Sequence, residues 1–308
     1  SWGQDFAASC RDFQMAAPRY IKMAIVGIPV YAAAAFGAYI AFKKPNPKAG
    51  LSQTGALVQD PFVCAGAASN RSVYDDTAGK YDSAVGWDEA AMGLLLLRRW
   101  LLRSASGRTL EVACGTGRNV PYYPEAANPV VLSDASRGML AQANAKAQQV
   151  WGSSTPSTAA AGSSSGGRAW SLAHSTAEAL PFAAGSFDTV LSTFSLCSVD
   201  DPAAALRGMA RVCAPSGRIL LLEHGRSDAW PTVNGWLDGS APAHACKWGC
   251  WWNRDLHALV EAAEKQGVLQ VTKVWRTHFG TTLWVEAVPG PAAQGADTEE
   301  QALAPAQG

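Results

Sequence analysis

The sequence predicts an α/β fold in which a mostly parallel sheet is covered by helices on both faces. Short apolar segments typical of buried strands alternate with segments of helical periodicity between residues 87 and 288. Glycine or polar residues follow several of these strands directly, as expected where ligands bind beyond the carboxyl ends of parallel strands. Two strand-like segments in succession end the pattern, and this pair predicts one antiparallel strand at the edge of the sheet.

The helices are expected from apolar periodicity and from residue types that favour helix ends. Residues 87–103 are apolar at helical spacing and end in arginines. The segment 202–212 begins behind Asp201, and aspartate is a residue type that caps helices by accepting from their first backbone N–H groups. Two further helices are expected at 138–151 and 254–266.

The strands are expected where short apolar runs are bounded by glycine, proline or aspartate. The run at 109–113 leads into a turn with two glycines, and the run at 129–133 ends at Asp134. In chain order, strands are expected at 109–113, 129–133, 169–173, 187–193, 217–223, 268–275 and 282–288.

Composition and charge exclude several classes of protein. The 308 residues include 25 Lys and Arg and 25 Asp and Glu, so the net charge is zero. A chain without a basic surplus is an unlikely partner for nucleic acid, because phosphate contacts require one. Apolar residues make up 48% of the chain, which excludes disorder throughout. The seven cysteines are scattered, unlike those of a small disulfide scaffold.

An uncharged segment near the beginning of the sequence predicts a membrane anchor. Residues 23–42, MAIVGIPVYAAAAFGAYIAF, have the length that spans a bilayer as a helix, and lysines flank them. A cleaved signal peptide and a buried helix of a soluble domain are the alternatives, and the apolar stretch is long and starts late for a signal peptide. We therefore predict that residues 23–42 cross the lipid bilayer once. Basic residues are balanced on the two sides, which leaves the orientation open.

The rest of the chain divides into one globular domain and segments of simpler composition. Residues 152–167 are rich in Ser, Gly and Ala without an apolar period, which is typical of a flexible surface insertion. The last 20 residues have the same character. We expect an N-terminal segment at 1–22, the transmembrane helix at 23–42, a linker at 43–73, the domain at 74–288 and a disordered tail at 289–308.

The strongest local signal is the glycine turn after the strand at 109–113. Gly115 and Gly117 let a ligand approach the backbone closely, but Val120 stands where a dinucleotide fingerprint has its third glycine. Glu111, inside the strand, is expected where a cationic amino-acid group must be met. Asp134 ends the next strand, where a carboxylate accepts both hydroxyls of a ribose. The combination predicts a ligand that joins a nucleoside to an amino acid.

These residues resemble the class I S-adenosylmethionine-dependent methyltransferases. The segment E-V-A-C-G-T-G, residues 111–117, is similar to the first motif of that family. The segment D-A-S-R-G-M-L, residues 134–140, resembles its ribose motif, and 177–182, 185–188 and 212–219 resemble later motifs. Tyr81 and Asp82 are similar to a Y-D pair that covers the cofactor in many members. The resemblance spans residues 74–288 and implies a Rossmann-like, seven-stranded methyltransferase sheet with one antiparallel strand.

The resemblance also implies the cofactor site, with two departures. Ala113 stands where the family usually has glycine, and Thr176 stands where an acidic residue often meets the adenine. The implied cofactor is S-adenosylmethionine, and no metal is expected. The residues implied to bind the cofactor are Glu111, Ala113, Gly115, Gly117, Asp134, Met139, Ala177, Glu178 and Phe194.

A narrower resemblance concerns the second half of the chain. The segments S-L-C-S-V (195–199), L-L-E-H-G (221–225), W-G-C-W-W-N-R-D (248–255) and H-F-G-T-T (278–282) are similar to the membrane-anchored methyltransferase-like proteins of fungal mitochondria. The membrane-bound alkyl-thiol methyltransferases of animals share the L-C-S-V and E-H segments. This resemblance implies a single pass through an organelle membrane, and the mitochondrial inner membrane is the one expected. The methyl acceptor, a small molecule or a protein, stays open.

Several other residues have two readings. His224 follows a strand and is a candidate general base, or else a histidine satisfied by a backbone carbonyl. His244, Cys246, Cys250 and His257 suggest a zinc site, but their spacing is not that of a standard zinc finger, and the alternative is a loop cysteine and a helix histidine packed near tryptophans. The tryptophan-rich stretch 230–252 is expected to cover the cleft, where it could bind an apolar substrate, meet the membrane surface or belong to the core.

Methyl transfer itself requires few catalytic side chains, because positioning of the acceptor supplies most of the acceleration. The sequence therefore predicts a membrane-anchored methyltransferase. The alternative is an assembly or scaffold subunit of a membrane complex that keeps the fold without turnover.

Overall fold

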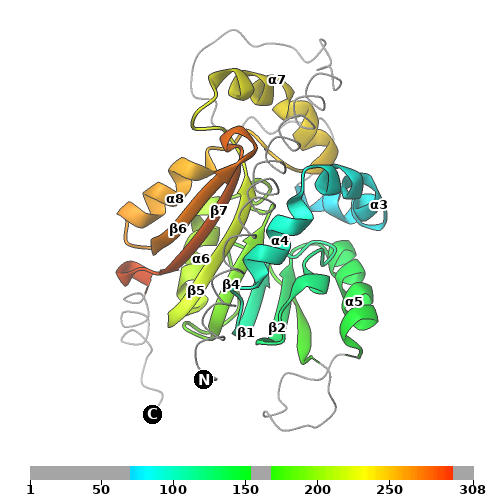
Figure 1. The fold of residues 1–308 in the computed structure, drawn as a ribbon. Coiled ribbons are helices and arrows are strands. Elements are labelled where there is room, and N and C mark those ends of the chain that lie inside the picture. Colours follow the sequence, from blue (N-terminus) through cyan, green and yellow to red (C-terminus); the bar gives the residue numbers. More distant parts are fainter. Residues whose placement is uncertain (1–69, 154–167, 294–308) are drawn as a thin grey trace, which may run out of the picture. The chain divides into compact units, whose positions relative to one another are not determined.

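The computed structural model describes residues 70–153 and 168–293, which belong to one compact unit of the chain (Figure 1). The predicted membrane span at 23–42 lies outside the described residues, as do most of the predicted insertion and tail. Among the described helices, none is both long and apolar enough to cross a membrane.

The described part of the chain contains a seven-stranded sheet with the order β3-β2-β1-β4-β5-β7-β6. This confirms the predicted mostly parallel sheet, since every pair from β3 through to β5 is parallel. The strand order reverses between β1 and β4, and ligands of such sheets bind at that point of reversal. The strands are β1 (Gly107–Val112), β2 (Ala127–Asp134), β3 (Trp170–His174), β4 (Phe187–Thr193), β5 (Cys213–His224), β6 (Leu269–Thr277) and β7 (Thr282–Pro289).

The one antiparallel strand, β7, is present but is not at the edge. It pairs antiparallel with both β5 and β6, so that β6 is the outer strand. A short 3-10 turn, His278–Gly280, joins β6 to β7, and a connection of this length permits only an antiparallel pair. The sequence predicted the pair but could not decide which of its two strands meets β5.

Helices cover both faces of the sheet (Figure 1). The helices α4 and α5 share one apolar cluster with the sheet, which includes Leu101, Leu140 and Leu220. The helices α6 and α8 share the other, which includes Met209, Val260 and Leu221. Because consecutive residues of β5 enter opposite clusters, residues 219–222 of this strand are apolar in succession rather than alternating with polar residues. The helices are α3 (Asn70–Ala91), α4 (Leu94–Leu102), α5 (Arg137–Trp151), α6 (Pro202–Val212), α7 (Pro231–Trp248) and α8 (Leu256–Lys265).

Two helices differ from the prediction. The single helix expected at 87–103 is divided into α3 and α4, because Gly93 has a φ of 70° and its left-handed conformation breaks the helical path. The tryptophan-rich stretch forms α7, which the sequence did not identify as a helix. Pro242 lies inside α7 and Pro231 begins it, and proline within a segment argues against a helix.

The domain extends beyond both predicted boundaries. Helix α3 begins at Asn70, within the expected linker. At the other end, Gly290 and Ala292 donate backbone hydrogen bonds to Val268 and Gly267. Residues 289–293 are therefore held against the domain rather than belonging to the tail.

Candidate functional site

A cavity of about 310 Å³ lies at the carboxyl ends of β1, β2 and β4. This is the place that the strand order favours for a ligand, and the volume lies in the range of small-molecule sites. Its wall combines backbone of the glycine turn, polar side chains and aromatic rings. The lining residues are Tyr74, Tyr81, Arg98, Ala113, Cys114, Gly115, Thr116, Arg118, Asp134, Ala135, Ser136, Met139, Thr176, Ala177, Glu178, Thr193, Phe194, Ser195, Ser198, Val199 and Asp200.

The backbone of Gly115 forms part of the wall of this cavity. Its φ is 55°, and a Cβ atom built on it would meet no atom within 4 Å. A side chain would therefore occupy cavity space instead of clashing with the protein. The glycine thus leaves open space beside the backbone of the turn.

Asp134 connects the ends of β1 and β2. Its Oδ2 atom accepts a hydrogen bond from the Gly115 N–H at 2.8 Å, and its Oδ1 atom accepts one from the Ser136 N–H at 2.8 Å. Burial raises the pKa of this carboxyl, although the two backbone donors oppose the shift. Each carboxylate oxygen has a second lone pair, so Asp134 keeps the capacity to accept two ligand hydroxyls.

Two residues of the cavity wall have left-handed backbone conformations although they carry a Cβ atom. Ala113, which replaces the usual glycine, has a φ of 52°, and Phe194 has a φ of 54°. Such a conformation costs a non-glycine residue roughly 1–2 kcal/mol. Ala113 therefore preserves the turn at the expense of some backbone strain, and strained residues cluster at functional sites.

Glu111 and Gly117 lie behind the cavity wall and do not line it. The Glu111 carboxylate is buried and accepts hydrogen bonds from Asn119 Nδ2 at 2.8 Å and Tyr123 Oη at 2.6 Å. A Cβ atom on Gly117 would lie 3.2 Å from the Ala143 Cα atom of α5. In this structure Glu111 supports the turn by binding the Asn119 side chain. Gly117, which has no side chain, allows α5 to pack closely against the turn.

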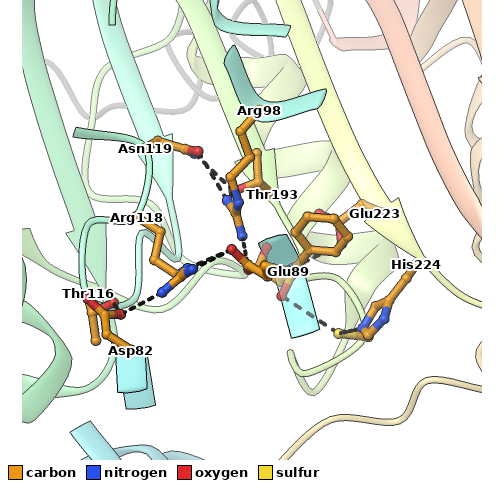
Figure 2. A network of polar contacts seen from close by, with 12 residues as sticks. Asp82, Glu89, Arg98, Thr116, Arg118, Asn119, Thr193, Glu223 and His224 are labelled. Atoms are coloured by element: carbon orange, nitrogen blue, oxygen red, sulfur yellow. Dashed lines mark hydrogen bonds and ion pairs between the residues drawn. The ribbon is translucent and has the colours of Figure 1, made fainter. Parts of the chain in front are cut away.

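A network of charged side chains, most of them buried, supports the same turn (Figure 2). The Arg98 guanidinium contacts Glu89 at 2.9 Å, and the Arg118 guanidinium contacts the other Glu89 oxygen at 2.6 Å. Burial raises the pKa of Glu89, but the two arginines outweigh it and leave the pKa below its ordinary value. Arg118 also contacts Asp82, which accepts from Thr116 Oγ1 at 2.5 Å. The network thus joins α3 and α4 to the turn after β1.

Helix α3 carries the residues that close the cavity on one side. The Tyr74 hydroxyl is 2.6 Å from Ser198 Oγ, after β4, and Asp75 Oδ1 accepts from the Gly138 N–H at the start of α5. Tyr81 and Asp82, the pair that the sequence singled out, are on this helix, with Tyr81 in the cavity wall. The helix is therefore fastened to the loops after two strands.

The structure brings most of the other predicted residues together. Met139, Ala177, Glu178 and Phe194 line the cavity, and Glu178 Oε1 accepts from the Asp200 N–H at 2.9 Å. Thr176 also lines it. These residues come from helix α5, the loop after β3 and the loop after β4, which only the sheet assembles.

His224 does not line the cavity. Its ring lies behind Phe194, with ring centroids 5.5 Å apart, and contacts the sulfur atoms of Cys197 and Cys250. The Cys250 sulfur therefore faces His224, whereas His244 Nδ1 lies 2.9 Å from the Cys250 backbone carbonyl oxygen. His244 stacks on Trp252, and His257 contacts Glu261.

Sequence reasoning missed the basic residues of the wall. Arg98 lies in a run of leucines, where an arginine suggests a snorkelling surface residue. Arg118 follows the glycine turn but belongs to no motif considered above. The only signal was the presence of Arg98 on the apolar face of a helix, where burial requires a partner.

Comparisons with known proteins agree with this geometry. Residues 110–221 match the family model described as Methyltransferase domain. The chain is 31% identical over 228 residues to the mitochondrial methyltransferase OMS1 of Saccharomyces cerevisiae, and the alignment covers 72% of this chain and 46% of that protein. It is 34% identical over 159 residues to the demethylmenaquinone methyltransferase of Renibacterium salmoninarum, covering 49% and 57%. The chain thus spans about half the length of these curated relatives.

Solved structures show the same fold at low identity. The structure of DhpI in complex with SAH has a TM-score of 0.50 at 18% identity, and the alignment covers 72% of this chain and 96% of that one. The [4+2]-cyclase SpnF has a TM-score of 0.50 at 17% identity, covering 71% and 95%. The second of these is named for another reaction, so the fold alone does not specify the chemistry.

Proposed function

Because the described part of this chain is a class I S-adenosylmethionine-dependent methyltransferase domain, we propose that the protein methylates a small acceptor at a mitochondrial membrane. The observation that carries the proposal is the cavity wall formed by Gly115 and Asp134. It presents open backbone and a carboxylate at the same edge of the sheet.

The residues of this wall fit S-adenosylmethionine. Gly115 leaves space for a ligand, and Asp134 has acceptor capacity for two ribose hydroxyls. The Nε atom of Arg98 is buried and has no hydrogen-bond partner among the described residues. The Arg98 guanidinium, which contacts Glu89 at 2.9 Å, is part of the wall, and a positively charged group there suits the carboxylate of an amino-acid group.

When bound, S-adenosylmethionine supplies an electrophilic methyl group on a sulfonium. The chain contributes binding, orientation and exclusion of water. Asp134 would bind the ribose and Arg98 the carboxylate. Thr176 would lie near the adenine. Tyr74 and Tyr81 cover the cavity from α3, and positioning of this kind accounts for most of the rate of a displacement reaction.

The acceptor proposal draws on relatives and on the predicted anchor. One relative is named for demethylmenaquinone, and another, 29% identical over 130 residues, is the phosphatidylethanolamine N-methyltransferase of Cereibacter sphaeroides. Both named substrates are lipids, and residues 23–42 would hold the domain beside a bilayer. A demethylated quinone and phosphatidylethanolamine are therefore the first acceptors to test, followed by alkyl thiols and proteins. Nucleic acid is disfavoured by the zero net charge.

Calorimetric titration of the full chain with S-adenosylmethionine tests the first half of the proposal, and we expect one molecule to bind. Transfer of a labelled methyl group to the acceptors above, in detergent micelles, tests the second half. Binding without transfer to any of them would favour the assembly subunit. Absence of binding would exclude the methyltransferase.

A further inference from the structure

A cluster of three metal-binding side chains lies behind the cavity and is not used by the proposed function. The Cys197 and Cys250 sulfur atoms are 3.2 Å apart, and His224 Nε2 lies 3.2 Å from each of them. The two thiols are buried, at 1% and 7% exposure. A disulfide bond would bring the sulfurs to about 2.05 Å, so these are two free thiols facing one imidazole nitrogen.

We propose that Cys197, His224 and Cys250 bind a divalent metal ion of the zinc class. Thiolate and imidazole are the ligands that select zinc over magnesium or calcium. Zinc bonds of about 2.3 Å to sulfur and 2.0–2.1 Å to nitrogen place tetrahedral ligand atoms about 3.5–3.8 Å apart. The observed triangle of 3.2 Å needs to expand by only about half an ångström to reach this spacing.

The charge balance also fits a buried dication. Two cysteine thiolates neutralise the charge of a zinc ion, and a neutral complex is far less costly to bury than a free ion. Three ligands from the protein are the number found in catalytic zinc sites, where water or substrate fills the fourth position. The described residues supply three such ligands.

The backbone around the cluster is already held in place. The three ligands come from the loop after β4, the end of β5 and the connection between α7 and α8. The Trp251 N–H donates to the Cys197 carbonyl at 2.9 Å, and the Arg254 guanidinium donates to the Leu196 carbonyl at 2.9 Å. Gly249, with a φ of 65°, ends α7 and turns the chain so that Cys250 enters the cluster. Fixed segments of this kind hold ligands ready for a metal.

The cluster adjoins the cavity wall. Ser198 Oγ lies 3.4 Å from the Cys197 sulfur and lines the cavity, where it also contacts the Tyr74 hydroxyl. On the other side, Phe194 separates His224 from the cavity. A metal ion bound here would restrain Ser198 and Phe194, the two residues of the cavity wall that adjoin the cluster.

Elemental analysis of the full chain, purified in reducing buffer with added zinc, tests the proposal. We expect about one tightly held zinc ion per chain, and a loss of zinc affinity of about tenfold or more in Cys250→Ser and Cys197→Ser. Cys213→Ser is the matched control, because Cys213 is also a buried free thiol but lies outside the cluster, and it should keep its zinc.

Cobalt binding to the parent chain provides a spectroscopic readout that does not rely on the two cluster variants. The cobalt-loaded parent chain should show an intense sulfur-to-cobalt charge-transfer band, which the Cys213→Ser control retains. A parent chain that binds no metal, or a cluster variant that folds and binds zinc as tightly as the parent, would overturn the proposal. So would a Cys197–Cys250 disulfide mapped by mass spectrometry in protein purified in reducing buffer. None of these outcomes depends on whether the chain binds S-adenosylmethionine.

Discussion

The backbone N–H of Gly115 donates a hydrogen bond to Asp134 Oδ2 at 2.8 Å, and this bond joins the turn after β1 to the end of β2. Asp134 therefore has two functions in the structure. It presents a carboxylate to the cavity, and it holds the turn against which a ligand would lie. Substitutions here should affect both ligand affinity and stability.

Asp134→Ala should weaken S-adenosylmethionine binding by about 10- to 1000-fold, since charge-assisted hydrogen bonds are each worth roughly 1.5–3 kcal/mol. It should also lower the free energy of unfolding by about 1–3 kcal/mol, because the Gly115 and Ser136 amides lose their acceptor. Calorimetric titration and thermal melting measure the two effects.

The control for Asp134 is Asp188→Ala. Asp188 Oδ2 accepts from the Arg108 N–H at 2.8 Å, and Asp188 does not line the cavity. This variant loses a similar bond but should keep full affinity. Equal affinities for the Asp134 and Asp188 variants would contradict the assignment of the ribose to Asp134.

Gly115→Ala should reduce S-adenosylmethionine affinity at least about tenfold, because the new methyl group enters cavity space that is otherwise open. Gly185→Ala is its matched control. Gly185 has a φ of 62°, close to that of Gly115, and lies outside the cavity. Both variants incur the strain of a left-handed alanine, so their melting temperatures should fall alike. Only the first should bind poorly.

Gly117→Val should destabilise the domain instead of blocking the cofactor directly. The added side chain would meet Val120 and the backbone of Ala143, so it would push α5 from the turn. Left-handed strain and overpacking together predict a loss of about 2–5 kcal/mol. Urea unfolding measures it. A folded variant of unchanged stability that does not bind would instead mean that Gly117, as expected from the sequence, lets a ligand approach the backbone closely.

The stability of the domain should depend on pH through Glu111. Burial raises the pKa of Glu111 to about 7 from an ordinary value of 4.5, although the Tyr123 hydroxyl opposes the shift. The native state therefore binds more protons than the unfolded state between these values. The free energy of unfolding should fall as pH rises through this window, by about 3 kcal/mol in total.

The Glu111→Gln variant isolates this effect, because its amide oxygen still accepts from Asn119 without titrating. Between pH 4.5 and 8, the parent should lose stability relative to the variant, as followed by urea unfolding at each pH. Parallel curves for the two proteins would mean that Glu111 has no raised pKa.

The predicted anchor is tested by alkaline carbonate extraction of membranes that contain the full chain. We expect the protein to stay in the membrane pellet. Ala32→Asp combined with Ala35→Asp places two charges in the middle of the segment, each costing about 2.5–3.5 kcal/mol at the centre of a bilayer helix. That variant should appear in the supernatant. Release of the parent chain under the same conditions would exclude a transmembrane anchor.

The sequence by itself determined the fold class, the strands and the edge of the sheet at which the cavity forms. Alternation of apolar runs with helical periods specifies a parallel sheet, and residues such as Gly115 and Asp134 must then lie at one edge, because parallel strands end together. These are local patterns, and each is visible within about ten residues of sequence.

Only the tertiary structure decided which side chains reach the cavity and which stand behind it. Glu111 and Gly117 belong to the same motif as Gly115, yet neither lines the cavity. Glu111 contacts Asn119, and Gly117 packs against α5. The grouping of Cys197, His224 and Cys250 joins segments more than 20 residues apart, and no spacing rule predicts it. Contacts of this kind depend on how the loops after β4, β5 and α7 pack, and packing over long sequence distances leaves no periodic trace in the chain.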